Sequence, residues 1–297
     1  MDRTIGVIAG ERIAAAVVAG EEILSGVCHF PNLEEDNNEL LSMPMEGMAQ
    51  TIARVILETC GGNLADAGAI GIGFPGIIKD SVIVESPNLR QAKGSNLKEL
   101  VGGVLREQGF TVPVHIYNSA DVTAAGLAAT RGQLERFIRV WTLGTGVGYG
   151  RYPHTGAVLE GGHLTVSLDP KEGFCGCGGK GHLEGIVGHR AMRLRFLDME
   201  PEEVFECAAE GDQRCLDFVR RWHKALAAAT ATCIHLEGPG KFYISGFNAR
   251  FVQPVLLNQY LSEFVTMLPL QGSGVEVVTS GDEVAIVGAA VNARRAA

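Results

Sequence analysis

The sequence predicts an α/β protein of two domains with a cleft between them, and three features point to this fold class. The chain has 297 residues, which is enough for two domains of ordinary size. Its 39 glycines are too many for a helical bundle and suit a protein with many tight turns. Both halves of the chain also share one plan, in which antiparallel strands are followed by strands that alternate with helices.

The first half is predicted to begin with two or three antiparallel strands joined by short turns. Apolar runs, including two short continuous ones typical of buried strands, predict strands at residues 4–9, 13–19, 23–30, 69–74 and 112–117. Helical spacing of apolar residues predicts helices at residues 46–60, at 96–108 with Asn96 as N-cap, and from Ser119 or its neighbour to about residue 130.

The second half repeats this alternation around two glycine-rich loops at residues 144–150 and 160–184. The predicted strands are residues 137–143, 241–245 and 274–279. The predicted helical segments are residues 201–236, 251–266 and 284–296. We therefore expect an N-terminal α/β domain made of residues 1–117 and 285–297. Residues 118–284 would form the C-terminal α/β domain.

Charge and composition exclude some classes of function. The formal net charge is −9, and no run of Lys and Arg provides a footprint for nucleic acid. The first residues lack the basic and then apolar layout of a signal peptide. No apolar stretch reaches the roughly 18 residues that a membrane span requires. We expect a cytoplasmic protein that binds neither nucleic acid nor membranes.

Four side chains in the second glycine-rich loop suggest a metal site. Cys175, Cys177 and His182 lie within eight positions, separated by glycines that let the backbone wrap round an ion, and His163 lies a dozen residues earlier. Two thiolates and two imidazoles form a closed tetrahedral set for structural Zn²⁺. The alternative is a pair of free cysteines in a flexible loop. If one ring nitrogen of His163 binds zinc, the other becomes a fixed hydrogen-bonding group.

Several motifs, in order along nearly the whole chain, resemble the ROK (repressor, open reading frame, kinase) sugar-kinase family. In the Cys175–Glu184 motif, His182 stands where the family usually has a third cysteine. The matching segments are Gly71-Ile72-Gly73-Phe74-Pro75-Gly76, Ser86-Pro87-Asn88-Leu89, Leu143 to Gly150, Glu160-Gly161-Gly162-His163, Cys175 to Glu184, and Gly288-Ala289-Ala290. The resemblance implies the actin-like ATPase fold (ribonuclease H-like, hexokinase-like), with homodimers as the usual assembly.

The resemblance also implies a pocket for a small-molecule sugar. The positions that match the family's sugar-binding residues are Asn88, Asn118, Glu160, His163 and Glu184. Carboxylates and amides pair with vicinal hydroxyl groups, and a site built from them rejects analogues that lack a hydroxyl. Each residue alone could instead serve a turn or a cap, as Asn88 after Pro87 would.

The resemblance also implies a nucleotide site for ATP and Mg²⁺, at positions Gly10, Gly144, Thr145, Gly146 and Gly246. The backbone N–H groups of the loop at 144–148 can cradle phosphate, although such a loop could also be a simple hairpin turn. The segment at Gly246 is less glycine-rich than in the family.

The first phosphate loop departs from the family pattern Asp-x-Gly-Gly-Thr. Its positions are occupied by Val7, Ala9 and Glu11 in place of Asp, Gly and Thr. A carboxylate at Glu11 would repel phosphate unless it binds a cation.

The expected catalytic base is also missing. The family's Asn-Asp pair is Asn118-Ser119 here, and Ser119 has no useful basicity at neutral pH. Asp121 is the alternative base, but two residues along a helix rotate a side chain by about 200°, which places Asp121 on the far face from residue 119.

Three functions follow from these observations. The first is an ATP-dependent sugar kinase that phosphorylates a hexose hydroxyl, impaired at Ser119. The second is a catalytically inactive, sugar-binding pseudokinase that acts as a sensor or scaffold. The third is a transcriptional repressor. Repressors of this family carry an N-terminal helix-turn-helix, for which a kinase-like core that begins at residue 4 leaves no room.

Overall fold

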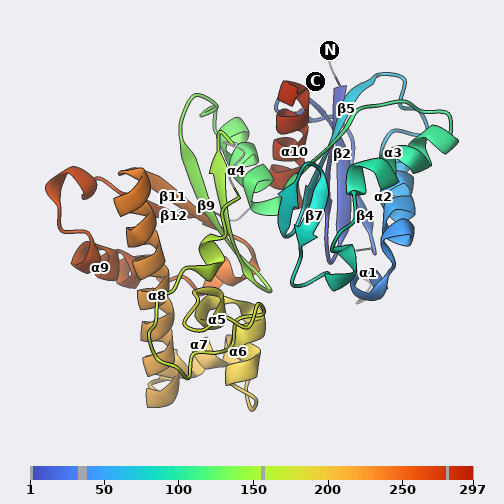
Figure 1. The fold of residues 1–297 in the computed structure, drawn as a ribbon. Helices are drawn as coiled ribbons and strands as arrows, with labels where there is room; N and C mark the ends of the chain where they lie inside the picture. Colours follow the sequence, from blue (N-terminus) through green and yellow to red (C-terminus); the bar gives the residue numbers. More distant parts are fainter. Residues whose placement is uncertain (1–2, 33–38, 155–157, 279–280, 297) are drawn as a thin grey trace. The chain divides into compact units, whose positions relative to one another are not determined.

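A computed structural model describes residues 3–32, 39–154, 158–278 and 281–296 of the chain (Figure 1). The chain forms two compact units of mixed α/β structure, as the sequence predicts. Unit 1 comprises Met1–Ile138, Gly150–Val158 and Ser280–Ala297, and unit 2 comprises Arg139–Tyr149 and Leu159–Thr279. Within the described ranges, no helix is long and apolar enough to cross a membrane.

Unit 1 contains a six-stranded sheet in the order β3-β2-β1-β5-β8, with β4 also paired to β2. Strands β1 and β2 are antiparallel, whereas β1, β5 and β8 are parallel. The strands are β1 (Arg3–Ala9), β2 (Ile13–Ala19), β3 (Glu22–Ile23), β4 (Cys28–Phe30), β5 (Ala67–Phe74) and β8 (Val114–Asn118). The apolar run predicted as a strand at residues 23–30 is therefore divided into two short strands.

Helices cover both faces of this sheet, as Figure 1 shows for α10 on one side and α2 and α3 on the other. Ile5 and Val7 of β1 pack with α2 and α3. On the opposite face, a Cβ atom at Gly6 would lie 1.9 Å from the carbonyl oxygen of Ile286, so glycine is what lets α10 approach the sheet. The helices are α1 (Glu39–Ser42), α2 (Met45–Thr59), α3 (Leu97–Glu107), α4 (Ser119–Thr130), α10 (Asp282–Ala296) and the 3₁₀ turn η1 (Arg90–Ala92).

Helix α4 belongs to unit 1 because it packs closely on α10. A Cβ atom at Gly126 would lie 1.7 Å from the carbonyl oxygen of Val284, so the two helices touch through their backbones. The sequence places the domain boundary before this helix, at residues 117 and 118. This boundary between independently folding domains stays a prediction. A small hairpin of β6 (Ile77–Lys79) and β7 (Val82–Glu85), which the sequence pattern does not predict, completes unit 1.

Unit 2 is organised round a four-stranded sheet in the order β10-β9-β11-β12, in which β9, β11 and β12 are parallel. Its core gathers large side chains such as Trp141, Trp222 and Phe242. The strands are β9 (Ile138–Leu143), β10 (Val147–Tyr152), β11 (Lys241–Ser245) and β12 (Gly274–Val277). The helices are α5 (Glu184–Val187), α6 (His189–Arg195), α7 (Pro201–Glu210), α8 (Gln213–Glu237), α9 (Pro254–Phe264) and the 3₁₀ turns η2 (Gly161–His163), η3 (Phe247–Phe251) and η4 (Leu268–Leu270).

Candidate functional site

The four predicted metal ligands lie together in unit 2. One ligand atom from each of His163, Cys175, Cys177 and His182 lies within 4.8 Å of all the others. The Sγ atom of Cys175 is 3.3 Å from Nδ1 of His163 and 3.4 Å from Sγ of Cys177. The Sγ atom of Cys177 is also 3.3 Å from Nδ1 of His182. The sequence prediction that these residues form one cluster agrees with this geometry.

The donor set and its spacing fit a tetrahedral zinc ion. With ordinary Zn–S and Zn–N bonds, a regular tetrahedron separates two sulfurs by about 3.8 Å and a sulfur and a nitrogen by about 3.6 Å. The separations above are within a few tenths of an ångström of these values. Burial raises the pKa of the Cys175 thiol above its usual value, so a bound cation would supply the charge that keeps this sulfur ionised.

Two glycines explain the tight course of the backbone round this cluster. A Cβ atom at Gly179 would lie 2.1 Å from Cε1 of the His182 ring. Gly181 has a φ of +68°, and a Cβ atom there would lie 1.8 Å from the carbonyl oxygen of Ser167. The Gly179 N–H also points at Sγ of Cys177, 3.3 Å away. Larger residues at either glycine would displace the ligand-bearing loop.

His163 has its two ring nitrogens directed at different partners. Nδ1 faces Cys175, and Nε2 lies 3.5 Å from Oε2 of Glu160. Glu160 precedes the turn η2, and its carbonyl oxygen accepts the His163 N–H at 2.9 Å. A metal on Nδ1 would therefore leave the Nε2 proton beside the Glu160 carboxylate, which fixes the tautomer of the ring. Both side chains are partly exposed and retain capacity to hydrogen bond to a ligand.

Glu184 lies at the start of α5, beside both the cluster and the first strand residue after the glycine loop. Its Oε2 accepts the N–H of Val147 at 3.1 Å, and its Oε1 lies 3.4 Å from Sγ of Cys175. Three of the predicted sugar ligands, Glu160, His163 and Glu184, thus occur round one metal cluster in unit 2.

The glycine loop at Gly144–Gly146 is held by its carbonyl groups. The N–H groups of His189 and Arg190, in the first turn of α6, donate to the carbonyl oxygens of Gly144 and Thr145 at 3.0 and 3.2 Å. The buried side chain of Asn248 donates from Nδ2 to the Gly144 carbonyl at 3.4 Å. With its carbonyl groups occupied in this way, the loop is fixed more firmly than a free hairpin turn.

A cavity of about 780 Å³ opens beside this loop. Most of its wall could not be predicted from the sequence, because the basic residues of α6 match no known motif. The lining residues are Thr145, His189, Arg190, Arg193, Leu194, Phe196, Leu197, Asp198, Met199, Glu200 and Glu203.

Gly246 lies at the end of β11, in the same part of unit 2. It has a φ of +94°, and a Cβ atom there would lie 2.3 Å from the Leu143 carbonyl oxygen, so no other residue fits well. The next residue, Phe247, is 49% exposed and packs edge-on against the His189 ring, with centroids 5.1 Å apart. An aromatic face and a glycine-bearing turn are thus both next to the glycine loop.

The predicted sugar ligands of unit 1 lie at turns. Asn118 is the N-cap of α4: its Oδ1 accepts the Ala120 N–H, and its Nδ2 donates to the Gly76 carbonyl, both at 2.8 Å. Asn88 is exposed at a turn closed by the Leu89 N–H and the Ser86 carbonyl, which are 3.2 Å apart. Asn118 therefore has a structural role as a cap, and it still has one N–H and a lone pair for a ligand.

Ser119 is the first residue of α4, and Asp121 lies in the first helical turn. The Oδ1 atom of Asp121 accepts the Arg151 N–H at 3.0 Å, and Oδ2 lies 3.1 Å from Nδ1 of His154. This hydrogen bond raises the pKa of His154 above its usual value. The Asp121 carboxylate therefore joins α4 to the end of β10 and to His154, which follows that strand. The Asp121 side chain is only 14% exposed.

The residues that match the family's first phosphate loop begin in the buried part of β1. Val7 is fully buried between β1 and the α2 and α3 helices, where no ion could reach a side chain. Ala9 is buried as well, whereas Glu11 is exposed. The turn at Gly10 is closed by its own N–H and the Arg12 carbonyl, which are 2.9 Å apart.

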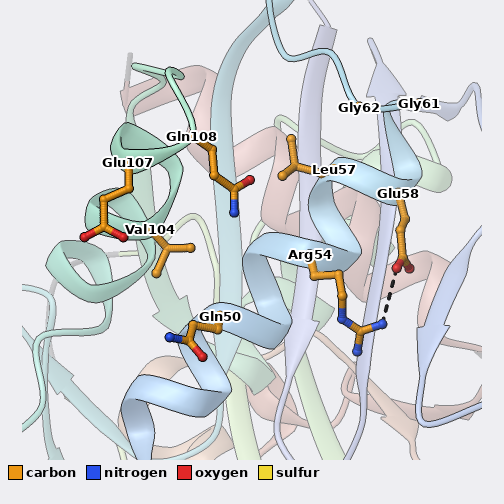
Figure 2. A pocket seen from close by; sticks show the side chains of 9 residues that line it. All are labelled: Gln50, Arg54, Leu57, Glu58, Gly61, Gly62, Val104, Glu107 and Gln108. Carbon is orange, nitrogen blue, oxygen red and sulfur yellow. Dashed lines mark hydrogen bonds and ion pairs between the residues drawn. The ribbon is translucent and has the colours of Figure 1, made fainter.

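A second cavity, of about 650 Å³, lies between α2 and α3 in unit 1 (Figure 2). Its wall includes Gln50, Arg54 and Glu58 of α2 and Val104 and Glu107 of α3, and in Figure 2 Arg54 and Glu58 lie on the side of α2 away from Glu107. The Arg54 guanidinium already pairs with Glu58 at 3.2 Å. None of the predicted site residues lines this cavity, and we assign it no part in the site.

Comparison with known proteins gives consistent matches. The sequence profile of the ROK family matches residues 8–296. A glucokinase from Pyrobaculum calidifontis is 28% identical over 76% of the chain and 78% of its own length. An N-acetylmannosamine kinase from Haemophilus influenzae is 25% identical over 95% of the chain and 92% of its own length.

A solved structure supports the fold as well. A ROK family glucokinase from Streptomyces griseus, crystallised with glucose and AMPPNP, is 25% identical and superposes with a TM-score of 0.73. The match covers 99% of both chains. The protein has the two-domain, actin-like ATPase fold that its motifs predict.

Proposed function

Because the chain belongs to the ROK family, we propose that it is a sugar kinase in which phosphoryl transfer is impaired at Ser119. It would bind a hexose or an N-acetylhexosamine together with ATP and Mg²⁺. The named relatives, a glucokinase and an N-acetylmannosamine kinase, support these two classes of sugar. The position of Ser119, at the start of α4 where the family has its catalytic Asp, is the observation that carries the proposal.

The chemistry explains why this position matters. A sugar hydroxyl oxygen attacks the γ-phosphorus of ATP, the bond to the β,γ-bridging oxygen breaks, and the hydroxyl proton must leave. A carboxylate at residue 119 would accept that proton, but a serine hydroxyl is not basic enough. Loss of a general base typically slows a reaction by roughly 10²–10⁴-fold. Asp121 does not replace it, because its side chain is only 14% exposed and its carboxylate is directed at the Arg151 N–H and the His154 ring.

The predicted sugar-binding positions match the family pattern better than the positions for phosphoryl transfer do. Glu160, His163 and Glu184 lie round the Cys/His cluster of unit 2. Asn88 and Asn118 remain predicted sugar ligands on the family resemblance alone. We propose that Zn²⁺ on His163, Cys175, Cys177 and His182 has a structural role and orients the first three of these side chains. For the nucleotide, the cavity beside Thr145 supports a triphosphate near the glycine loop, with Arg190 and Arg193 in its wall.

A sugar-binding pseudokinase is the second candidate. The burial of Val7 favours it, since the family's metal-side Asp is replaced by a core residue. The low basicity of Ser119 acts in the same direction. Such a protein would bind sugar and transfer no phosphoryl group, as a sensor or scaffold.

Calorimetry of the zinc-loaded protein distinguishes the candidates. The protein is titrated with ATP·Mg²⁺ and then with a panel of hexoses and N-acetylhexosamines, and ADP formation is followed in parallel. Binding of both ligands, with slow sugar-dependent ADP release, is the result we expect. Sugar binding without nucleotide binding would establish the pseudokinase instead. Binding of neither ligand would contradict both candidates.

A further inference from the structure

Glu184 connects the metal cluster to the glycine loop through contacts at both ends of its carboxylate. Oε2 accepts the Val147 N–H at 3.1 Å, where β10 leaves the glycine loop. Oε1 lies 3.4 Å from Sγ of the cluster residue Cys175. A carboxylate that accepts a backbone N–H makes a charge-assisted hydrogen bond, which is stronger than a neutral one.

The backbone strengthens this connection. The ligand His182 and Glu184 belong to one turn, in which the Gly185 N–H donates to the His182 carbonyl at 3.0 Å. Between them, the Leu183 N–H donates to the Leu164 carbonyl at 2.9 Å, next to the ligand His163. A metal-bound Cys175 has no proton to donate. In the loaded protein the connection therefore runs through this turn.

Val147 is also fixed on its other side. A Cβ atom at Gly162, in the turn that holds His163, would lie 2.0 Å from the Val147 carbonyl oxygen. The first residue after the loop is thus enclosed between the His163 turn and the His182 turn. Both turns carry metal ligands, so an ion that joins them would hold Val147 in place.

We propose that Glu184 is a positioning residue that makes the order of the glycine loop depend on the metal. Metal loading fixes the His182 turn, Glu184 then holds the Val147 N–H, and the loop keeps the conformation that accepts nucleotide phosphates. Metal and nucleotide should therefore strengthen each other's binding, since coupling between two sites is reciprocal. The nucleotide part rests on the proposed kinase function, whereas the effect on the loop rests only on the proposed metal binding.

This role is compatible with a sugar contact. An ionised carboxylate has about four acceptor positions, and the two contacts above use one on each oxygen. A sugar hydroxyl could still donate to Glu184. Experiments on the positioning role are therefore carried out without sugar.

Hydrogen exchange at the Val147 amide tests the connection directly. Zinc-loaded wild type should protect this amide about tenfold or more over the chelated protein, which is the effect of losing one charge-assisted hydrogen bond. Loaded Glu184→Ala should exchange like chelated wild type. Glu184→Gln keeps an acceptor oxygen and should restore most of the protection. Glu210→Ala, at an exposed glutamate of α7, should behave like wild type.

The amides of α8 serve as an internal reference, because they report global unfolding. Equal Val147 exchange in loaded wild type and loaded Glu184→Ala would overturn the proposal. A loss of protection on chelation that is as large in α8 as at Val147 would overturn it too. If Glu184→Ala does not fold, loaded and chelated wild type still give the decisive comparison.

Calorimetry with AMPPNP·Mg²⁺ measures the consequence for nucleotide binding. Chelation should weaken binding to wild type at least about fivefold, the lower end of typical coupling, and should have no effect on Glu184→Ala. Equal affinities in loaded and chelated wild type would refute the coupling. If wild type binds no nucleotide at all, the proposed function fails, and the Val147 exchange still decides the role of Glu184.

Discussion

The N-terminus of α4 places a serine and a carboxylate two residues apart with very different surroundings. Ser119 opens the helix beside the N-cap Asn118, whose amide is bonded to Ala120 and Gly76. Asp121 turns away and joins the helix to Arg151 and His154. Nearness in sequence therefore does not make Asp121 available as a base.

Replacing Asp121 with Asn tests this assignment. We expect Asp121→Asn to leave the turnover number within a few-fold of wild type, because the Asn oxygen can still accept the Arg151 N–H. The pKa of His154, which this carboxylate raises, should fall toward its usual value in an NMR titration. A 10²-fold or greater loss of turnover would show instead that Asp121 is the base. Asp217→Asn, at an exposed helix position, is the matched control.

At the scale of elements, the loop at residues 160–184 brings the four predicted metal ligands together. Glycines at 179 and 181 allow the turn, and the four side chains of the cluster converge there. We expect one zinc per chain by elemental mass spectrometry. Cys177→Ser should lose most of that zinc, because a hydroxyl is a poor ligand for it.

Cys207→Ser is the matched control for the metal site. Cys207 lies on α7, outside the cluster, and its replacement should leave the zinc content unchanged. Full zinc content in Cys177→Ser would contradict the ligand assignment.

The junction of α8 and α9 contains a buried histidine whose protonation opposes folding. Nδ1 of His223 lies 2.8 Å from the Val219 carbonyl, and Nε2 accepts the Gln253 N–H at 2.8 Å. Burial lowers the pKa of His223 to about 4. The folded protein therefore keeps this ring neutral well below the pH at which the unfolded chain protonates it.

This histidine should make stability depend on pH. Its folded pKa lies below its unfolded value of about 6.5, so its contribution is complete above pH 6.5. The contribution is lost as the pH falls toward 4, up to about 3 kcal/mol. His223→Gln should reduce the fall in unfolding free energy between pH 7.5 and 4.5, measured with urea. The exposed His235→Gln is the control. The same pH dependence in His223→Gln and wild type would rule out this explanation.

Most strands and long helices could be predicted from the sequence because their apolar spacing is regular. Strand β11 (Lys241–Ser245) matches its prediction at both ends, and α10 extends its prediction by two residues at the start. The helices α5 and α6 were missed, since glycines and charged residues interrupt their pattern. The cavity beside Thr145 was missed for a related reason, because its wall joins residues spaced along α6 with the segment that follows it.

The candidate site shows the same limit. Contiguous motifs predicted four metal ligands, which the structure brings together, and five sugar ligands. The roles of both sets remain proposals. The partner of Glu184 in the glycine loop, Val147, is 37 residues away in sequence, and no local pattern predicts the contact. Likewise, the engagement of Asp121 by His154 depends on how the chain returns after β10.

At the scale of the whole molecule, the family profile and the superposition cover nearly the entire chain. The homodimer implied by the family resemblance stays a prediction, which light scattering can measure.

Binding of two ligands should be visible as added stability of the whole protein. A ligand at 100 times its dissociation constant stabilises the folded state by about 2.7 kcal/mol. We therefore expect AMPPNP·Mg²⁺ and the cognate sugar each to raise the melting temperature by several degrees. A sugar lacking one hydroxyl should give a much smaller shift. Equal shifts with the cognate and the deoxy sugar would contradict a pocket built from paired polar groups.

Turnover of the Ser119→Asp variant tests the central claim most directly. Sugar-dependent ADP formation would be measured for wild type and variant, both zinc-loaded, with saturating ATP·Mg²⁺ and the sugar that binds best. If only the base is missing, the variant should turn over about 10²–10⁴-fold faster than wild type, with similar sugar affinity. No gain in a variant that still binds both ligands would contradict the claim that Ser119 limits phosphoryl transfer.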